Sequence, residues 1–576
     1  MTARGEPAGR GRSGRRERTS GRPAAILKCA ALLLLLAVPP GCGRSPAPPS
    51  GSSGAAGATG AAPTGPVRFV FPLPIEPATL NFVSGTDQSS VLVQRLVGDL
   101  LVDHDPDLHV VPRLAASWDV SADGKVLTFH LRPGVRFHDG VPCTSDDVVF
   151  TYERIMDPAS KAVGRVDPFL PIEKVEAPDP ATVRVTYREP YAPALRGWEI
   201  PILPAHLYRG ADFAAAKENR APVGTGPFRF VSWEAGQRIV LDANPDYWGG
   251  RPRIDGIDLR FIPSSDTALQ ALLTGEVDYA RLQPPEWEAR RTDADFQKRY
   301  REVRFVPLFY YYIAWRGDGS NPFFGDPRVR RAMTLALDRE GYVRSVYHGL
   351  GRLAGSPFQG LLAGSPEPPA GPDPVSAARL LDEAGWRADP KTGKRARGGV
   401  PLRFTLLVYS GGEDHVQFSQ VAQQNLKALG IEMRIERLDW QTLWARLKSG
   451  RFEAALSGFM PGADPDSLYG MLHSSQIEGG QNYAAWKDPE VDAWLDAARR
   501  TLDETQRTAL YRRIEARVLE RQPYSYLFAP VVLAAMSRRF DGALPSPQGI
   551  LGHHPGALAL FPATGSPASS TSPQGR

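Results

Sequence analysis

The stretch that most constrains the fold of this chain is residues 112–154, which combines a strand pair with a helix start. Residues 127–131 alternate apolar and polar side chains, as in a strand with one buried face. The Asp123-Gly124 dipeptide before them is typical of a hairpin turn. Thr144 and Asp147 have the spacing of a helix capping box. The stretch is therefore predicted to form a β-hairpin followed by an amphipathic helix.

Residues 112–154 also resemble the signature of the family 5 extracellular solute-binding proteins, which serve peptide and nickel uptake by ABC transporters. Residues 222–228 (PVGTGPF) and 326–340 (DPRVRRAMTLALDRE) are similar to later landmarks of the same family. The resemblance implies an α/β fold of the two-lobed periplasmic binding protein type (type II, cluster C-like) with an extra α+β domain. The residues that carry the match are Leu114-Ala115, Ser117-Trp118, Asp123-Gly124, Thr128-Phe129, Leu131-Arg132, Gly134-Val135, residues 137–140, Pro142, Thr144 and residues 146–149.

The first 41 residues are predicted to be an export signal of the lipoprotein kind. An arginine-rich start precedes an apolar core at residues 30–38, which is shorter than the roughly 20 residues of a membrane span. Gly41-Cys42 resembles a bacterial lipobox, so Cys42 is expected to carry the lipid that anchors the protein to a membrane. Arg15-Arg16 leaves a twin-arginine signal as the alternative.

The charge of the chain gives no reason to expect nucleic-acid binding. The formal net charge is +5, but residues 1–41 hold eight basic and two acidic side chains. Without them, 60 basic and 61 acidic residues remain, which is close to neutral. The basic excess therefore belongs to the leader, and no basic binding face is predicted.

The length of 576 residues predicts several domains. Strand, helix and strand patterns alternate between residues 377 and 435, which indicates a parallel α/β lobe. The resemblance implies two chain crossings between lobes, near Tyr312 and near Tyr524. The expected parts are a signal (1–41), a flexible Ser/Gly/Ala/Pro-rich linker (42–65), lobe I (66–106, 220–310 and 525–561), an appended domain (107–219), lobe II (311–524) and a disordered tail (562–576).

No catalytic constellation is visible in the sequence. It has no G-x-S-x-G elbow and no H-E-x-x-H motif, and His553-His554 has no Cys or acidic partner at metal-ligand spacing. Cys143 is predicted to be a half-buried packing residue. The chain is therefore predicted to be no enzyme, with no cofactor and no metal. A secreted hydrolase of peptides or glycans, and a binding protein that only signals, remain the alternatives.

The resemblance implies a ligand cleft between the lobes, lined by loops of both. A cleft with aromatic walls and few polar anchors suits a peptide or another small solute. Trp440 and Trp444, four residues apart on one predicted helix face, are expected in the core instead. The expected ligand-binding residues are Ser84, Gly85, Thr86, Tyr312, Trp315, Phe459, Met460, Asp464, Asp466, Asn482 and Tyr483.

One departure from the family bears on the ligand. In many peptide-binding relatives an acidic residue three positions before an Asp-Pro pair meets the ligand's α-amino group. Here Asp464-Pro465 is preceded at that place by Pro461, which has no charge. Either Asp464 or Asp466 takes the role, or the ligand is not a free-amine peptide; weak discrimination between free and N-acetylated peptides is expected.

The partners implied by the resemblance complete the prediction. A monomer is expected to bind a peptide, or alternatively a nickel chelate or oligosaccharide, and to dock on ABC transporter permease subunits. Membrane contact is expected through the N-terminal lipid alone.

Overall fold

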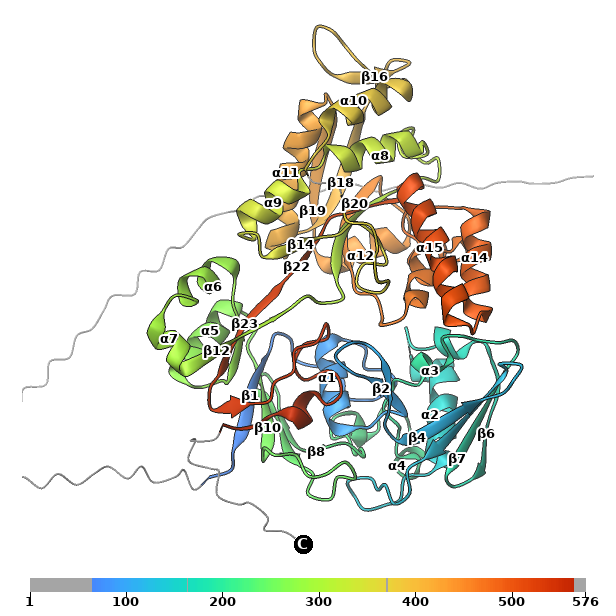
Figure 1. Cartoon of the computed structure of the whole chain (residues 1–576), viewed down its shortest axis with the longest axis vertical. Helices are drawn as coiled ribbons and strands as arrows, with labels where there is room; N and C mark the ends of the chain where they lie inside the picture. The colour runs from blue at the N-terminus through green and yellow to red at the C-terminus, as the bar shows by residue number, and fades with distance from the viewer. Residues whose placement is uncertain (1–64, 163, 369–370, 564–576) are drawn as a thin grey trace, which may run out of the picture. The chain divides into compact units, whose positions relative to one another are not determined.

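The structure, a computed structural model, describes residues 65–162, 164–368 and 371–563. Three main sheets organise these residues, and each joins segments that lie far apart in the sequence (Figure 1). Two of the sheets belong to the predicted lobes and one to the appended domain, and each is described in turn.

The first lobe is centred on a four-stranded sheet of order β1-β10-β9-β8. β1 and β10 are parallel, and the other pairs are antiparallel. A second sheet of order β11-β23-β12 takes its central strand from near the C-terminus. The elements are β1 (Arg68–Leu73), α1 (Gln88–Val97), β2 (Val102–His104), β3 (Val110–Pro112), β8 (Phe228–Glu234), β9 (Arg238–Ala243), β10 (Gly256–Phe261), α5 (Ser265–Thr274), β11 (Tyr279–Arg281), α6 (Pro284–Arg290), α7 (Ala294–Arg299), β12 (Tyr300–Phe305), β23 (Val532–Ser537), β24 (Phe540–Asp541) and β25 (Phe561–Pro562).

The appended domain confirms the predicted hairpin and helix. Its antiparallel sheet has the order β4-β5-β7-β6, and Gly124 turns the β4–β5 hairpin with a φ of +69°. The backbone N–H of Thr144 donates to the Asp147 carboxylate at 2.8 Å and closes the capping box of α2. The elements are β4 (Ala115–Val120), β5 (Val126–Leu131), α2 (Ser145–Met156), β6 (Ile172–Asp179), β7 (Thr182–Tyr187), α3 (Ala194–Gly197) and α4 (Ala205–Tyr208).

One hydrophobic core joins this domain to the first lobe, running from Phe69 in β1 through Phe129 in β5 to Leu560. Close backbone approach explains the glycines of 222–228, because a Cβ on Gly224 would lie 2.1 Å from the Val97 carbonyl oxygen. The predicted boundary at residue 107 falls inside the β2–β3 hairpin. We therefore move that boundary to the end of β3.

A buried polar network fixes the same junction. The Asp99 carboxylate accepts hydrogen bonds from Arg113 at 2.8 Å, from Tyr247 Oη at 2.8 Å and from Trp248 Nε1 at 2.7 Å. Arg113 also contacts His554 Nδ1 at 2.5 Å. Because its oxygens have strong donors, the buried Asp99 carboxylate is satisfied. The network ties the end of α1, the start of the signature stretch and the C-terminal segment together.

The second lobe contains a five-stranded sheet of order β19-β18-β20-β13-β21. The predicted parallel unit is confirmed for β18, β19 and β20, whereas β13 runs antiparallel to β20 and β21. The elements are β13 (Tyr310–Trp315), α8 (Pro327–Ala336), α9 (Arg339–Val346), β14 (Gly351–Leu353), α10 (Pro374–Glu383), β15 (Arg387–Ala388), β16 (Arg395–Arg397), β17 (Val400–Pro401), β18 (Arg403–Tyr409), α11 (Glu413–Ala428), β19 (Glu432–Leu438), α12 (Trp440–Lys448), β20 (Ala454–Phe459), α13 (Tyr469–Leu472), α14 (Pro489–Arg500), α15 (Glu504–Arg521), β21 (Tyr524–Tyr526) and β22 (Phe528–Pro530).

The side chains of strand β13 alternate between two separate hydrophobic cores of the second lobe. Ile313 and Trp315 point into a core shared with α8, α10 and α11. Tyr310, Tyr312 and Ala314 point into a core shared with α12, α14 and α15. Successive side chains of a strand face opposite sides, so both faces of this sheet are buried.

The structure corrects the places where the chain changes lobe. Tyr312 and Tyr524 lie within β13 and β21, not in connections. The chain enters β13 through residues 306–309, and β22 still pairs with β14 of the second lobe, so the return follows Pro530. Both connections leave the sheet at the end marked by Tyr310 and Tyr526, because β13 and β21 are antiparallel neighbours.

The structure predicts a loss of stability in acid. His138 Nε2 donates to the Gly226 carbonyl at 2.9 Å, and burial lowers the pKa of His138 to about 4. Burial also lowers the pKa values of His553 and His554 to about 4. Protonation of the unfolded chain near pH 6.5 then favours unfolding, so the free energy of unfolding should fall from pH 6.5 towards 4. Asp278, whose pKa burial raises to about 6, opposes this trend, as do Asp99, Asp147 and Asp466, whose pKa values burial also raises.

Urea unfolding between pH 4 and pH 7.5 measures this dependence. His138→Gln should reduce the slope of unfolding free energy against pH by up to ~1.4 kcal/mol per pH unit, the value for one proton. His348 is exposed, and within the described residues its side chain makes no hydrogen bond or ion pair; His348→Gln is therefore the control and should keep the wild-type slope. A wild-type stability that is constant or rises below pH 6.5 would contradict the prediction.

Candidate functional site

One edge of the second-lobe sheet collects the candidate site. β18, β19 and β20 are parallel, so Tyr409, Leu438 and Phe459 all lie at their carboxyl ends. Tyr310 at the start of β13 pairs with Phe459, which places the two lobe connections at this same edge. Ligands of open α/β sheets bind outside the carboxyl ends of the strands. This edge is therefore the candidate ligand-binding surface of the second lobe.

Aromatic rings follow this edge in a continuous series. Trp440, the first residue of α12, is 48% exposed and lies 5.6 Å from the Tyr409 ring between centroids. Tyr409 lies 5.9 Å from His415, and His415 lies 4.9 Å from Tyr311. The expectation that Trp440 is a core residue is wrong, because Trp440 is exposed at the surface, where its ring stacks on Trp444. An exposed, ordered indole is suited to ligand contact.

Asp414 and His415 supply the polar groups of the same edge, from the first turn of α11. Tyr311 Oη donates to the Asp414 carboxylate at 3.4 Å. In the described part of the chain, no Lys, Arg or His nitrogen lies within 4 Å of that carboxylate. Burial lowers the pKa of His415, which keeps its ring neutral at pH 7. The edge thus presents a carboxylate without a cationic partner.

Four predicted site residues lie at or just behind this edge. Phe459 ends β20, and Met460 next to it is 61% exposed. Tyr483 packs behind the aromatic series, with its ring 6.0 Å from Trp444. Tyr312 is buried against Tyr524 at 5.3 Å and supports the edge from the core. The structure thus brings Phe459 and Met460 to the surface and places the two tyrosines beneath it.

Trp315 and Asn482 are placed in the interior instead. Trp315 is fully buried, and its Nε1 donates to Ser525 Oγ at 2.8 Å. Asn482 is also buried; its amide donates to the carbonyls of His473 and Trp486 and accepts from the Trp486 N–H. The polar atoms of both side chains are occupied by the protein. We therefore leave these two residues out of the candidate site.

Asp464 and Asp466 each have an arginine partner. Arg507 holds the Asp464 carboxylate through two contacts of 2.6 and 3.0 Å. Arg499 holds Asp466 at 2.7 and 3.0 Å. Burial is the main influence on Asp466 and raises its pKa, against the opposing effect of Arg499. Both charges are compensated within the second lobe, so neither aspartate presents a free anion to a ligand.

The loop Ser84-Gly85-Thr86 belongs to the first lobe, just before α1. Gly85 is buried, and its carbonyl accepts from Gln94 Nε2 at 3.0 Å and Arg165 at 2.7 Å. Thr86 is exposed and Ser84 half-buried. Among the described residues, no hydrogen bond or ion pair joins this loop to the aromatic edge. Its part in ligand binding stays a prediction.

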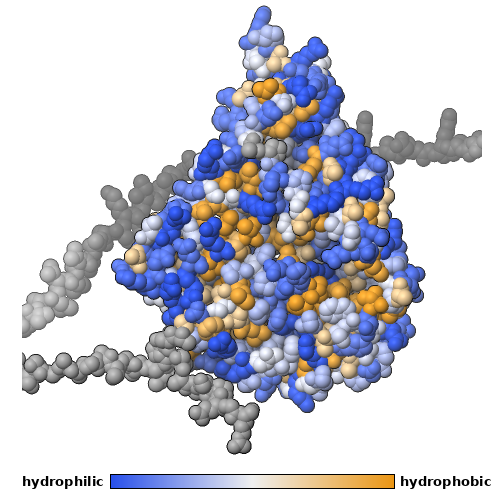
Figure 2. All heavy atoms as spheres, in the orientation of Figure 1, coloured by the Kyte–Doolittle hydropathy of each residue, from blue (hydrophilic) through white to orange (hydrophobic). Residues whose placement is uncertain are grey.

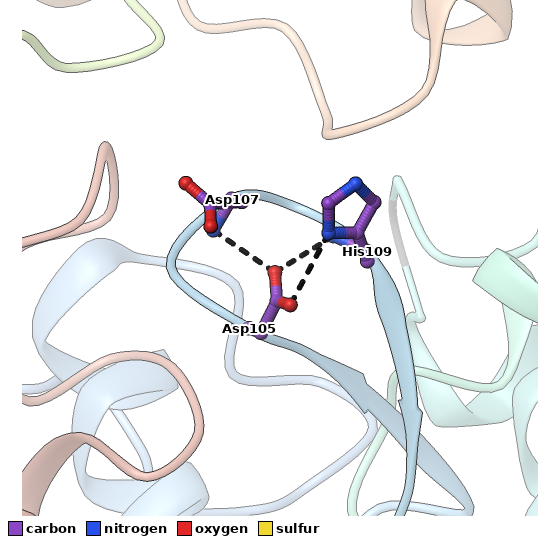
Figure 3. Close-up of side chains that lie close together, drawn as sticks. All are labelled: Asp105, Asp107 and His109. Atoms are coloured by element: carbon purple, nitrogen blue, oxygen red, sulfur yellow. Dashed lines mark hydrogen bonds and ion pairs between the residues drawn. The ribbon is translucent and has the colours of Figure 1, made fainter.

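Two clusters contain side chains of the types that bind metals, and in both clusters these side chains already have partners within the protein. Asp105, Asp107 and His109 lie together in the β2–β3 loop (Figure 3), but Asp105 already accepts the backbone N–H groups of Asp107 and His109, both at 2.9 Å. His553 Nδ1 lies 3.0 Å from Ser546 Oγ, while His554 contacts Arg113. The first group closes a turn and the second belongs to the buried junction.

Sequence reasoning missed Tyr409, Asp414, His415 and the exposure of Trp440. The signal was present, because Tyr409 ends a predicted strand and the Gly411-Gly412 pair leads directly into a helix. The rule that ligands lie at the carboxyl ends of parallel strands selects this loop. Acidic residues in the first turn of a helix also interact favourably with the helix dipole, so Asp414 alone does not indicate a ligand site.

Comparison with known proteins identifies the family. Residues 109–480, more than half of the chain, match the bacterial extracellular solute-binding proteins, family 5 (middle).

Within the described residues, no helix has the length and apolar character needed to cross a membrane. Polar and apolar residues are interspersed on the face drawn in Figure 2.

Individual relatives agree over most of the chain. The oligopeptide-binding protein AppA of Bacillus subtilis (strain 168) is 31% identical over 484 residues, which are 81% of this chain and 87% of the relative. The structure of AppA with a nonapeptide matches with a TM-score of 0.72 and 28% identity, covering 87% of this chain and 100% of that chain. NikA from Brucella suis with Fe(III)-EDTA matches with a TM-score of 0.75 and 25% identity, covering 86% and 99%. The chain therefore belongs to the family 5 bacterial extracellular solute-binding proteins and shares their two-lobed α/β fold.

Proposed function

We propose that this protein captures a peptide, or a small solute of similar size, between its two lobes and delivers it to the permease of an ABC importer. The observation that carries the proposal is the aromatic edge with Asp414, which lies where the chain passes between lobes. AppA of Bacillus subtilis, similar over 81% of this chain, is named an oligopeptide-binding protein. Mass spectrometry of solute released on denaturation of the purified protein tests the proposal directly.

Ligand binding would act by closing the lobes. The two connections, residues 306–309 and the segment after Pro530, are the only covalent links between the lobes in the described chain, and they serve as the hinge. A solute that contacts both lobes favours the closed form by its differential affinity. The closed form then docks on the permease, and ATP is hydrolysed by other subunits of the importer.

The edge selects the chemistry of the ligand. Asp414, without a cationic partner in the described residues, suits the α-amino group of a peptide, since an unpaired carboxylate gains most from a bound cation. Trp440 and Tyr409 offer ring faces to apolar side chains. Asp464 is held by Arg507, so we assign the amine to Asp414. This assignment predicts a strong preference for free-amine peptides over N-acetylated peptides, in contrast to the weak discrimination expected from Pro461 alone.

Other ligands and roles have their own support. The similarity to NikA, whose structure holds Fe(III)-EDTA, favours a metal chelate as the second candidate ligand. An oligosaccharide would also stack on exposed indole rings. A hydrolase would need a positioned nucleophile or acid–base pair at this edge, and the family consists of binding proteins. Permease and ATPase genes beside this one would favour transport over signalling alone.

We further propose that the protein acts outside the cytoplasmic membrane as a lipid-anchored monomer, with residues 42–65 as its tether. Cys42 and residues 43–64 of the linker lie outside the described residues. Support comes from the sequence, in which Cys42 follows a short apolar segment, and from the name of the family, which describes extracellular proteins.

Asp414→Asn should remove the preference for a free α-amine. A hydrogen bond to a charged group contributes about 1.5–3 kcal/mol, so affinity for free-amine peptides should fall about tenfold to hundredfold. N-acetylated peptides should bind wild type and variant equally. Thermal shift with peptide pools, followed by calorimetry on a single peptide, measures both. Asp464→Asn is the control; loss of the preference there and not in Asp414→Asn would place the amine on Asp464.

Saturating ligand should compact the protein without changing its secondary structure, because closure moves the lobes as rigid bodies. Small-angle scattering should show a smaller radius of gyration with ligand, at unchanged far-ultraviolet circular dichroism. An unchanged radius at full occupancy would mean that the ligand lies within one lobe and would contradict the hinge.

Cys42→Ser should release the protein from membranes or leave its leader uncleaved. Several acyl chains hold a protein stably on a bilayer, whereas an unacylated tether has no comparable affinity. Fractionation of cells that express the variant measures the effect, with Cys143→Ser, a substitution inside the folded body, as the control. A variant of mature size that remains with the membranes would exclude the lipid anchor.

A further inference from the structure

The second lobe contains a cavity of about 690 Å³ far from the aromatic edge. Trp315 and Pro523 line it, and both lie at the end of the sheet opposite to Tyr310 and Phe459. Tyr310 and Trp315 are five residues apart along β13, which is about 16 Å at roughly 3.3 Å per residue. The remaining walls are the starts of α8 and α14, the loop between residues 484 and 488, and the end of α15. The transported solute at the aromatic edge therefore does not occupy it.

The walls of the cavity carry an excess of positive charge. Arg316 is paired with Asp318 at 2.7 Å, and Arg517 with Asp488 and Glu490 at 2.8 and 2.9 Å. These are all three acidic residues that line the cavity. Its basic lining residues are Arg316, Arg330, Lys487, Arg517 and Arg521. Glu520, just outside the lining, contacts Arg517 at 3.3 Å and Arg521 at 3.7 Å. Arg330 and Lys487 are therefore the two lining cations without a carboxylate within 4 Å among the described residues.

Arg330 is the buried part of this excess. Its side chain lies in the wall of the cavity with the whole residue 5% exposed, and it donates to the carbonyls of Phe324 and Arg521, both at 2.6 Å. These bonds satisfy its N–H groups but do not neutralise its charge. Within the described residues, no carboxylate oxygen lies within 4 Å of it, and burial lowers its pKa to about 10. A buried cation without a counter-charge is stabilised by any anion that reaches it.

Two further features of the lining mark the cavity. The N-termini of α8 and α14 meet at the cavity, where Pro327 and Pro489 line it, and the carboxylates of Asp326 and Asp488 already cap the first backbone N–H groups of these helices. Ala485 lines the cavity in the left-handed region, with a φ of +51°. That conformation is costly for a residue with a Cβ and is concentrated at functional sites.

From these observations we propose that the cavity is a second binding site, which takes a small organic anion bearing carboxylate or phosphate groups. Its volume lies within the range of about 300–1,000 Å³ that small-molecule sites span. Arg330 provides the buried counter-charge, and Lys487, exposed at the rim and without a described carboxylate within 4 Å, provides a mobile one. The site is independent of the transported solute.

Citrate and inorganic phosphate are suitable probes of the full-length protein, each compared with chloride at equal ionic strength. One of the two anions should raise the melting temperature of the wild type by mass action and bind measurably in calorimetry. Lys487→Glu should weaken that binding at least tenfold. Lys391→Glu makes the same change of net charge on an exposed turn and should bind as the wild type does. Lys487 is exposed, so its replacement leaves the fold intact.

A variant at the aromatic edge separates the two sites. Trp440→Ala should bind the anion with unchanged affinity, because Trp440 lies at the other end of the sheet. Failure of both anions to bind at 10 mM, equal binding by wild type and Lys487→Glu, or loss of binding in Trp440→Ala would each overturn the proposal. The first two results do not bear on solute capture at the aromatic edge, whereas loss of binding in Trp440→Ala would place the anion at that edge.

Discussion

The arrangement of the second lobe depends on one short strand, β13. Its alternating side chains divide the lobe into two cores, and its neighbours β20 and β21 both run antiparallel to it. Because the strand starts where β20 ends, the chain's entry from the first lobe and the carboxyl ends of the parallel strands share one edge. Strand pairing alone therefore places the candidate ligand surface beside the hinge, and no dedicated loop is needed to bring them together.

Pairing of charges distinguishes structural from functional groups in this protein. Asp99 is buried, but Arg113, Tyr247 and Trp248 satisfy its oxygens, and it holds the first lobe to the appended domain. Asp464 is likewise neutralised by Arg507. Among the described residues, the Asp414 carboxylate accepts a hydrogen bond from Tyr311 and lies beside Tyr347, but no cationic side chain lies within 4 Å of it, so its charge is available to a partner from outside. A buried or half-buried charge that the fold does not compensate is costly to keep, and binding is the plainest reason to keep it.

Local features of the fold could be predicted because local chemistry determines them. The Thr144–Asp147 capping box and the turn at Gly124 each depend on a few adjacent residues. The spacing of Trp440 and Trp444 correctly places them on one helix face, but it does not say which face the lobe covers. That depends on Tyr409 and on the neighbouring strand ends, which come together only in the folded sheet. Tertiary pairing, which no single stretch encodes, therefore decided the exposure of Trp440.

Trp315 and Phe459 show the same limit most clearly. Each ends a strand that the sequence predicts, and each was expected at the ligand for that reason. Residue pairing shows that β13 and β20 are antiparallel, so the two strand ends point to opposite edges of one sheet. Phe459 lies at the edge beside the lobe connections, whereas Trp315 lies at the far edge with the cationic cavity. A strand end can be found from sequence, but only the direction of its neighbours tells which edge it belongs to.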